Sequence, residues 1–121
     1  ISSLILPELT WLDLAENNLW GPVPRGVTPY LRKLRHIDIS ENQFSGHVDM
    51  TFSTSTVHAN YSHNKFTSAG FNAFNAAYES MRVVDLSSNR IKQAASQVFF
   101  NIPPNLEELN LSNNNIRGAL P

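Results

Sequence analysis

The feature that most constrains the fold of this chain is a motif that returns five times in one register. Each copy centres on an asparagine that follows a short apolar alternation, as in Leu12-x-Leu14-x-x-Asn17. The register asparagines are Asn17, Asn42, Asn64, Asn89 and Asn114, which gives steps of 25, 22, 25 and 25 residues. Self-similarity at a period of roughly 20 to 50 residues indicates a solenoid whose units stack in a row.

The alternation inside each copy predicts a short strand with one buried side. Residues two apart on a strand point to the same side of a sheet. No single repeat can bury its own apolar row, but stacked neighbours form a continuous core. The predicted core positions are Leu9, Leu12, Leu14, Leu19, Leu34, Ile37, Ile39, Phe44, Phe66, Met81, Val84, Leu86, Ile91, Leu106, Leu109, Leu111 and Ile116.

The five register asparagines are expected to form a structural ladder where the chain leaves each strand. A side-chain amide both donates and accepts hydrogen bonds. It therefore satisfies backbone groups of the turn that would otherwise be buried without a partner. Stacked coils place these amides one above the next.

Three copies end in tails similar to Leu-x-Gly-x-Ile-Pro, at residues 19–24, 44–49 and 116–121. With these tails the chain resembles the plant-type class of leucine-rich repeat. That class occurs in receptor-like proteins, receptor kinase ectodomains and polygalacturonase-inhibiting proteins. The resemblance implies an α/β solenoid with five parallel concave strands and short extra strands after them. It also implies short helices, 3₁₀ turns and loops on the convex side.

The third and fourth copies depart from this pattern. The third has Ala59 and Tyr61 in place of the leucine pair and is three residues shorter. The fourth has Gln93 where the tail glycine belongs. Segments 68–80 and 92–102 are rich in Ala, Phe and helix formers, so we predict short helices there and a kink at the third repeat.

Length and composition fit one domain over residues 1–121. The chain begins with Ile1 and stops at Pro121 inside a motif, so we expect a fragment of a longer protein. Terminal repeats normally carry polar caps, and uncapped ends predict self-association of the 121-residue fragment.

A formal net charge of −1 argues against nucleic-acid binding, and no apolar stretch is long enough to insert into a membrane. The chain has no cysteine, so disulfides and thiolate metal sites are excluded.

With the register fixed, the residues between the leucines are predicted to face solvent and to bind a partner. We expect partner contacts from Trp11, Asp13, Glu16, His36, Asp38, Glu41, His58, Asn60, His63, Val83, Asp85 and Glu108. The residues two positions before the five asparagines are placed on the same face; they are Ala15, Ser40, Ser62, Ser87 and Ser112.

Two properties of this face bear on function. Six of the ten acidic residues of the chain are among these expected contact residues, which include no Lys or Arg. A negative face of this kind favours a protein or peptide partner with a basic surface. The competing interpretation is that the Asp residues only solvate the strands. Trp11 beside His36 and His58 is a candidate anchor, or else a residue that a neighbouring repeat covers. Trp20 is expected to pack on the flank.

Metal and enzyme interpretations are disfavoured. His36, His58, His63 and Asp38 lie on a broad open surface, whereas zinc needs three or four convergent ligands. No phosphate loop, nucleophile elbow or HExxH motif is present. A catalytic triad also needs a pocket that excludes water. We therefore expect no metal, no cofactor and no catalysis.

The sequence thus favours a protein-recognition module, as in a receptor ectodomain or a secreted inhibitor. The alternative is a structural scaffold inside a larger, organellar or membrane-bound assembly. The family resemblance favours an extracellular or cell-surface location, while an organelle or the cytoplasm stays open. Two Asn-x-Ser sequons, at Asn60 and Asn110, arise from the repeat consensus itself and add little to this choice.

Overall fold

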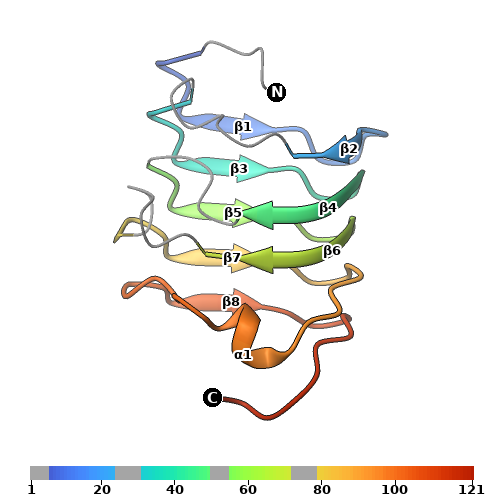
Figure 1. The fold of residues 1–121 in the computed structure, drawn as a ribbon. Coiled ribbons are helices and arrows are strands. Elements are labelled where there is room, and N and C mark those ends of the chain that lie inside the picture. Colours follow the sequence, from blue (N-terminus) through green and yellow to red (C-terminus); the bar gives the residue numbers. More distant parts are fainter. Residues whose placement is uncertain (1–5, 24–30, 50–54, 72–78) are drawn as a thin grey trace.

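The computed structural model describes residues 6–23, 31–49, 55–71 and 79–121, and it is a solenoid of parallel strands (Figure 1). Each repeat contributes one three-residue strand to a five-stranded sheet of order β1-β3-β5-β7-β8. These strands are β1 (Trp11–Asp13), β3 (His36–Asp38), β5 (His58–Asn60), β7 (Val83–Asp85) and β8 (Glu108–Asn110). The predicted fold class, a leucine-rich repeat solenoid with five parallel strands, is confirmed.

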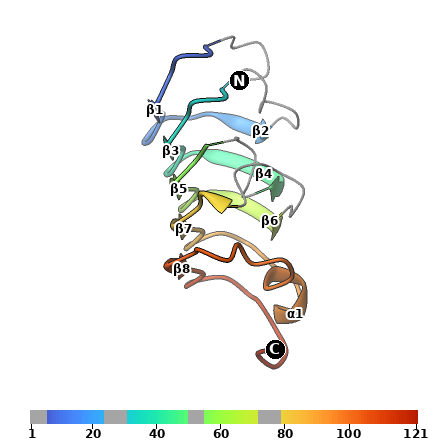
Figure 2. The same cartoon turned by 90° about the vertical axis from the view of Figure 1, so that its left-hand side faces the viewer.

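A second parallel sheet forms where the chain has turned away from the first. It contains β2 (Trp20–Pro22), β4 (Gln43–Asp49) and β6 (Lys65–Gly70) in that order. Figure 2 shows the two sheets as separate layers, with β2, β4 and β6 on the side away from the five-stranded sheet. The short helix α1 (Ala95–Val98) lies on the same side as these strands, next to β6.

The tail glycines of the first, second and fifth repeats are required by the backbone. Gly21, Gly46 and Gly118 have φ angles of +91°, +80° and +95°, a region that other residues rarely adopt. Gln93 takes the glycine position in the fourth repeat. Its side-chain oxygen accepts a hydrogen bond from the N–H of Ala69 at 2.8 Å, which ties the fourth repeat to the third.

The two predicted helical segments have different outcomes. In segment 92–102 a helix is present, but it covers only the four residues of α1. In segment 68–80 the helix prediction is wrong at residues 68–70, which form the end of β6 and pair with β4. Residues 72–78 lie outside the described residues. Pairing with a neighbouring strand outweighs the intrinsic helix preference of an Ala-containing segment.

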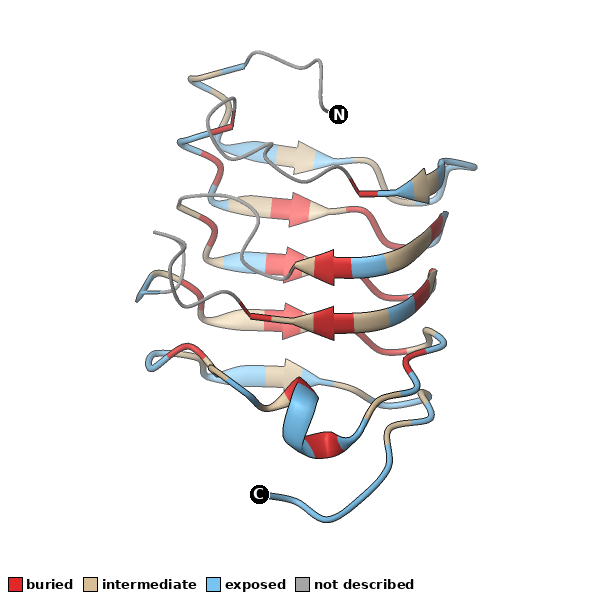
Figure 3. Cartoon of the chain, in the orientation of Figure 1, coloured by how far each residue is buried: buried red, intermediate tan, exposed pale blue. Residues whose placement is uncertain are grey.

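The core lies between the two sheets, and its central coils are the most buried (Figure 3). Ile37, Ile39, Val84 and Leu86 are at most 1% exposed. The corresponding leucines of the first and fifth repeats pack against this core but are only half-buried. Leu19 is 38% exposed, so its prediction as a core residue is wrong. A coil at the edge of the described stack has a neighbour on one side only.

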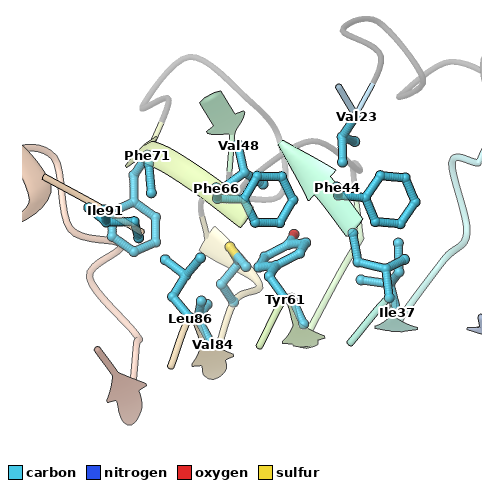
Figure 4. Close-up of a cluster of buried hydrophobic side chains, with 14 of the residues drawn as sticks. Val23, Ile37, Phe44, Val48, Tyr61, Phe66, Phe71, Val84, Leu86 and Ile91 are labelled. Atoms are coloured by element: carbon cyan, nitrogen blue, oxygen red, sulfur yellow. The ribbon is translucent and has the colours of Figure 1, made fainter. Parts of the chain in front are cut away.

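The third repeat keeps the core continuous despite its unusual residues. Ala59 and Tyr61 occupy the two leucine positions and are both buried. The Tyr61 ring packs edge-on against Phe66, with ring centroids 6.4 Å apart (Figure 4). A small residue and a large one thus share the volume of two leucines. Burial, with a smaller contribution from Asp49, raises the pKa of the Tyr61 phenol far above its ordinary value.

Candidate functional site

The solvent side of the five-stranded sheet carries two rows of side chains that run across all five strands. We call this surface the open sheet face. Its first row is Trp11, His36, His58, Val83 and Glu108, and its second row is Asp13, Asp38, Asn60, Asp85 and Asn110. Because parallel strands lie about 4.8 Å apart, each row is about 20 Å long.

The first row begins with an aromatic stack. The rings of Trp11 and His36 lie face to face, with centroids 3.6 Å apart and planes inclined by 9°. The His58 ring follows at 6.3 Å from His36, with a tilt of 30°. Strand register causes this arrangement, because the three residues are direct partners across β1, β3 and β5. Trp11 remains 62% exposed, so its outer ring surface faces solvent.

The environment of His36 favours its neutral form. Partial burial between its neighbours lowers the pKa of this imidazole below its ordinary value. The carboxylates of Asp38 and Asp13 oppose that shift, while His58 adds to it. Loss of hydration therefore outweighs the effect of the two nearby carboxylates on this pKa.

The second row holds the backbone at the end of each strand. Each Asp or Asn uses its Oδ1 to accept a hydrogen bond from the N–H two residues later, at 2.9–3.0 Å. Asp38, for example, accepts from Ser40, and Asp85 accepts from Ser87. The same bond holds the two sequon residues, Asn60 and Asn110, in their turns. These side chains have a structural role whether or not a partner contacts them.

Two columns that were predicted on the sheet face lie elsewhere. Ser40, Ser62 and Ser87 are 5–8% exposed, so their placement on the solvent face is wrong, whereas Ser112 in the last repeat is exposed. Once the Asx turn begins, the chain bends inward and the serine turns toward the interior. The next residue in each repeat, Glu16, Glu41, His63, Ser88 or Asn113, has a φ of 53–58° and lies in the turn beyond the strand. Glu16, Glu41 and His63 are exposed there, at the edge of the open sheet face.

Two arginines, Arg35 and Arg82, form a basic border where strands β3 and β7 begin, which the sequence did not predict. Arg35 precedes His36 at the start of β3 and is exposed. It lines a shallow hollow together with Thr10, Trp11, His36, Val57 and His58. Arg82 holds the corresponding place before β7 and lines a second hollow with Arg35, Ser55, Val57 and Ser80. The position seven residues before each register asparagine was the available signal, because it carries arginine in two repeats.

Trp20 does not pack on the flank as expected, because it is 81% exposed. It lies in β2, where it is the register partner of the exposed Gln43. The next residue, Gly21, pairs with the buried Phe44 and so takes the inward position. Alternation along β2 therefore directs Trp20 to solvent.

The register asparagines connect successive coils by hydrogen bonds. The Nδ2 group of Asn64 donates to the carbonyls of Tyr61 and Ser62 in its own coil and to Ile39 in the preceding one. Its Oδ1 accepts from the N–H of Phe44, also in the preceding coil, at 3.0 Å. Asn42, Asn89 and Asn114 make the same set of bonds, whereas Asn17 bonds only within its own coil among the described residues.

The part of the chain that the structure describes contains no group of three or more His, Asp or Glu side chains positioned to hold a metal ion. The rings of His36 and His58 lie 6.3 Å apart between centroids, with their planes tilted by 30°. Within the same ranges, no helix has the length and apolar character needed to cross a bilayer.

Comparison with known proteins identifies the family to which this architecture belongs. Two family models, both described as leucine-rich repeat, match residues 33–54 and 79–120. Receptor-like protein 41 of Arabidopsis thaliana is 32% identical over 96% of this chain, and Receptor-like protein 32 of the same plant is 32% identical over 94%. Receptor-like protein kinase BRI1-like 3, also from Arabidopsis thaliana, is 36% identical over 70% of the chain.

The parallel sheet, the asparagine bonds and these matches define a leucine-rich repeat protein. The chain belongs to the plant-type class of that family, as its glycine tails and its similarity to receptor-like proteins show. It spans 13%, 14% and 8% of the lengths of the three relatives named above. These matches identify the chain as a protein-interaction module with receptor-like relatives.

Proposed function

We propose that this chain recognises a protein partner on its open sheet face, as part of a receptor-like protein. The observation that carries the proposal is the Trp11–His36 stack. A tryptophan that is 62% exposed and held face to face against a neighbouring ring offers a large rigid apolar surface to solvent. Aromatic residues of this kind supply much of the binding energy at protein interfaces.

Charge on the same face supports a partner with a basic patch. The two rows carry four carboxylates, those of Asp13, Asp38, Asp85 and Glu108, and no Lys or Arg. Complementary charge speeds encounter and selects among partners more than it adds affinity. The stack therefore supplies affinity and the carboxylates supply selectivity. We assign no catalytic reaction to the chain.

Site-specific photocrosslinking tests this proposal. A benzophenone amino acid replaces Trp11 in one variant and Phe100 in a matched control. Phe100 is also exposed, at 68%, and it comes two residues after α1, which lies on the side of the second sheet (Figure 2). The protein is irradiated in an extract of its native tissue, and the crosslinked species are identified by mass spectrometry.

The expected result is one dominant partner that crosslinks from position 11 and not from position 100. Trp11→Ala, without the crosslinker, should weaken binding of that partner by about 30-fold, as for an interface anchor. A partner that crosslinks only from position 100 would contradict the proposal. That outcome would instead favour a scaffold whose contacts lie on its back.

A further inference from the structure

The arginine side chains of the described residues differ in how they are held. The Nη1 group of Arg82 donates to the carbonyls of Glu79, Ser80 and Met81 at 3.2–3.5 Å, and its Nε lies 4.0 Å from a Glu107 oxygen. Arg35 occupies the same repeat position two coils earlier. Among the described residues its guanidinium has no hydrogen-bond or ion-pair partner.

Arg35 also stands at a junction between two hollows. On one side it borders the hollow that contains Trp11, His36 and His58. On the other side it borders the hollow that contains Ser55, Ser80 and Arg82. Val57 lines both hollows, so they meet at this point. A guanidinium with no partner in the described parts of the chain therefore lies beside the exposed Trp11–His36 stack.

The chemistry of this arrangement selects a particular kind of group. A guanidinium binds a carboxylate through two parallel hydrogen bonds, and such charge-assisted bonds are stronger than neutral ones. The outer face of Trp11 accepts a planar or apolar side chain. The acidic side chains of the adjacent row on β1 and β3, Asp13 and Asp38, already accept backbone hydrogen bonds in their own turns.

We infer that the partner presents an acidic side chain to Arg35 next to an aromatic side chain that covers the Trp11–His36 stack. This inference rests on the proposed function and refines it. The partner then has a mixed charge pattern: basic groups face the carboxylates of the two rows, and an acidic group faces the border where the strands begin. The charge pattern fixes which way a bound segment runs across β1, β3 and β5.

Selection of displayed random heptapeptides on the immobilised protein tests the inference. Selected peptides are synthesised, and their dissociation constants are measured for the parent protein and for three variants, Trp11→Ala, Arg35→Gln and Arg90→Gln. Arg90→Gln is the matched control, because Arg90 is exposed and follows Asn89, beyond the sheet. Circular dichroism confirms that each variant is folded.

Peptides that need Trp11 should contain Glu or Asp next to an aromatic residue. Replacing that acid by its amide should weaken binding to the protein about 10-fold. The Arg35→Gln variant should bind the acidic peptide and its amide form equally weakly. The Arg90→Gln variant should distinguish the two peptides as the parent protein does. Trp11-dependent peptides that lack an acidic residue, or an acid preference that survives Arg35→Gln, would overturn the inference and leave the proposed function standing. Selection of peptides that never depend on Trp11 would contradict both.

Discussion

Asp38 stabilises a backbone turn and also adds negative charge to the open sheet face. It accepts a hydrogen bond from the N–H of Ser40 at 2.9 Å, and equivalent bonds recur in every repeat. Asparagine already fills this position at Asn60 and Asn110, so the turn needs an oxygen acceptor and not a charge. A charge reversal at this position would disturb the turn and the surface potential together.

We predict that Asp38→Asn changes the free energy of unfolding by less than about 0.5 kcal/mol, whereas Asp38→Ala lowers it by about 1 kcal/mol. The alanine variant leaves the N–H of Ser40 without its acceptor. Urea denaturation followed by circular dichroism measures both values. Equal destabilisation by Asn and Ala would show that the carboxylate charge, and not the turn, matters at this position.

Residues before the register asparagines have left-handed backbone. Glu41, with φ of 53°, is one of five such positions, and asparagine occupies the equivalent place at Asn113. Asn tolerates this region better than most residues, whereas β-branched residues are strongly disfavoured. Glu41→Asn should therefore raise the free energy of unfolding by about 0.5 kcal/mol, and Glu41→Val should lower it by about 1–2 kcal/mol. Thermal melts of the two variants in parallel check the order, and a valine variant as stable as the parent would contradict it.

The lowered pKa of His36 makes stability depend on pH. The unfolded chain takes up a proton near pH 6.5, the ordinary histidine value, while the folded chain takes it up only at lower pH. The contribution of His36 is thus fully present above about pH 6.5 and is lost as pH falls through the folded-state pKa.

We predict that the free energy of unfolding of the parent falls more steeply between about pH 7.5 and 5 than that of His36→Gln. The other three histidines are present in both proteins, so the difference between the two pH profiles reports on His36 together with its interaction with His58. Denaturant titrations at several pH values give the two slopes. Parallel slopes would show that folding leaves the proton affinity of His36 unchanged.

At the scale of elements, periodicity predicted the strands of the first sheet. Leucines and isoleucines two apart specify one buried side, and the asparagine marks where each strand ends. The second sheet followed from family resemblance instead. The composition of segment 68–80 predicts a helix, whereas residues 68–70 form a strand by pairing with β4, about 20 positions earlier in the chain. Local composition carries no information about that pairing.

The hydrogen bonds of the register asparagines connect one coil to the next and give a testable cost. We predict that Asn42→Ala or Asn89→Ala lowers the free energy of unfolding by about 1–3 kcal/mol, since each removes bonds to two coils and leaves backbone groups without partners. Asn17→Ala is the control, because Asn17 is exposed and bonds only within its own coil among the described residues. Unfolding curves for the three variants provide the test, and equal midpoints for all of them would contradict a role in joining coils.

At the scale of the whole molecule, the register assigned residues to columns but did not show how they interact. It placed Trp11, His36 and His58 in one row, and the structure adds that the first two rings stack. It gave no sign that Arg35 borders the same row without a partner among the described residues. Exposure of Trp20 was also missed, because an isolated tryptophan in a tail has no periodic pattern that fixes its direction.

The most direct test of recognition by the open sheet face is hydroxyl-radical footprinting of the protein with and without its captured partner. The partner is the one recovered from either crosslinking position, so the choice of probe does not bias the result. We predict that oxidation of Trp11 and His36 falls several-fold in the complex while oxidation of Phe100 is unchanged. Unaltered oxidation of Trp11 and His36, with protection of Phe100, would contradict partner recognition on this face.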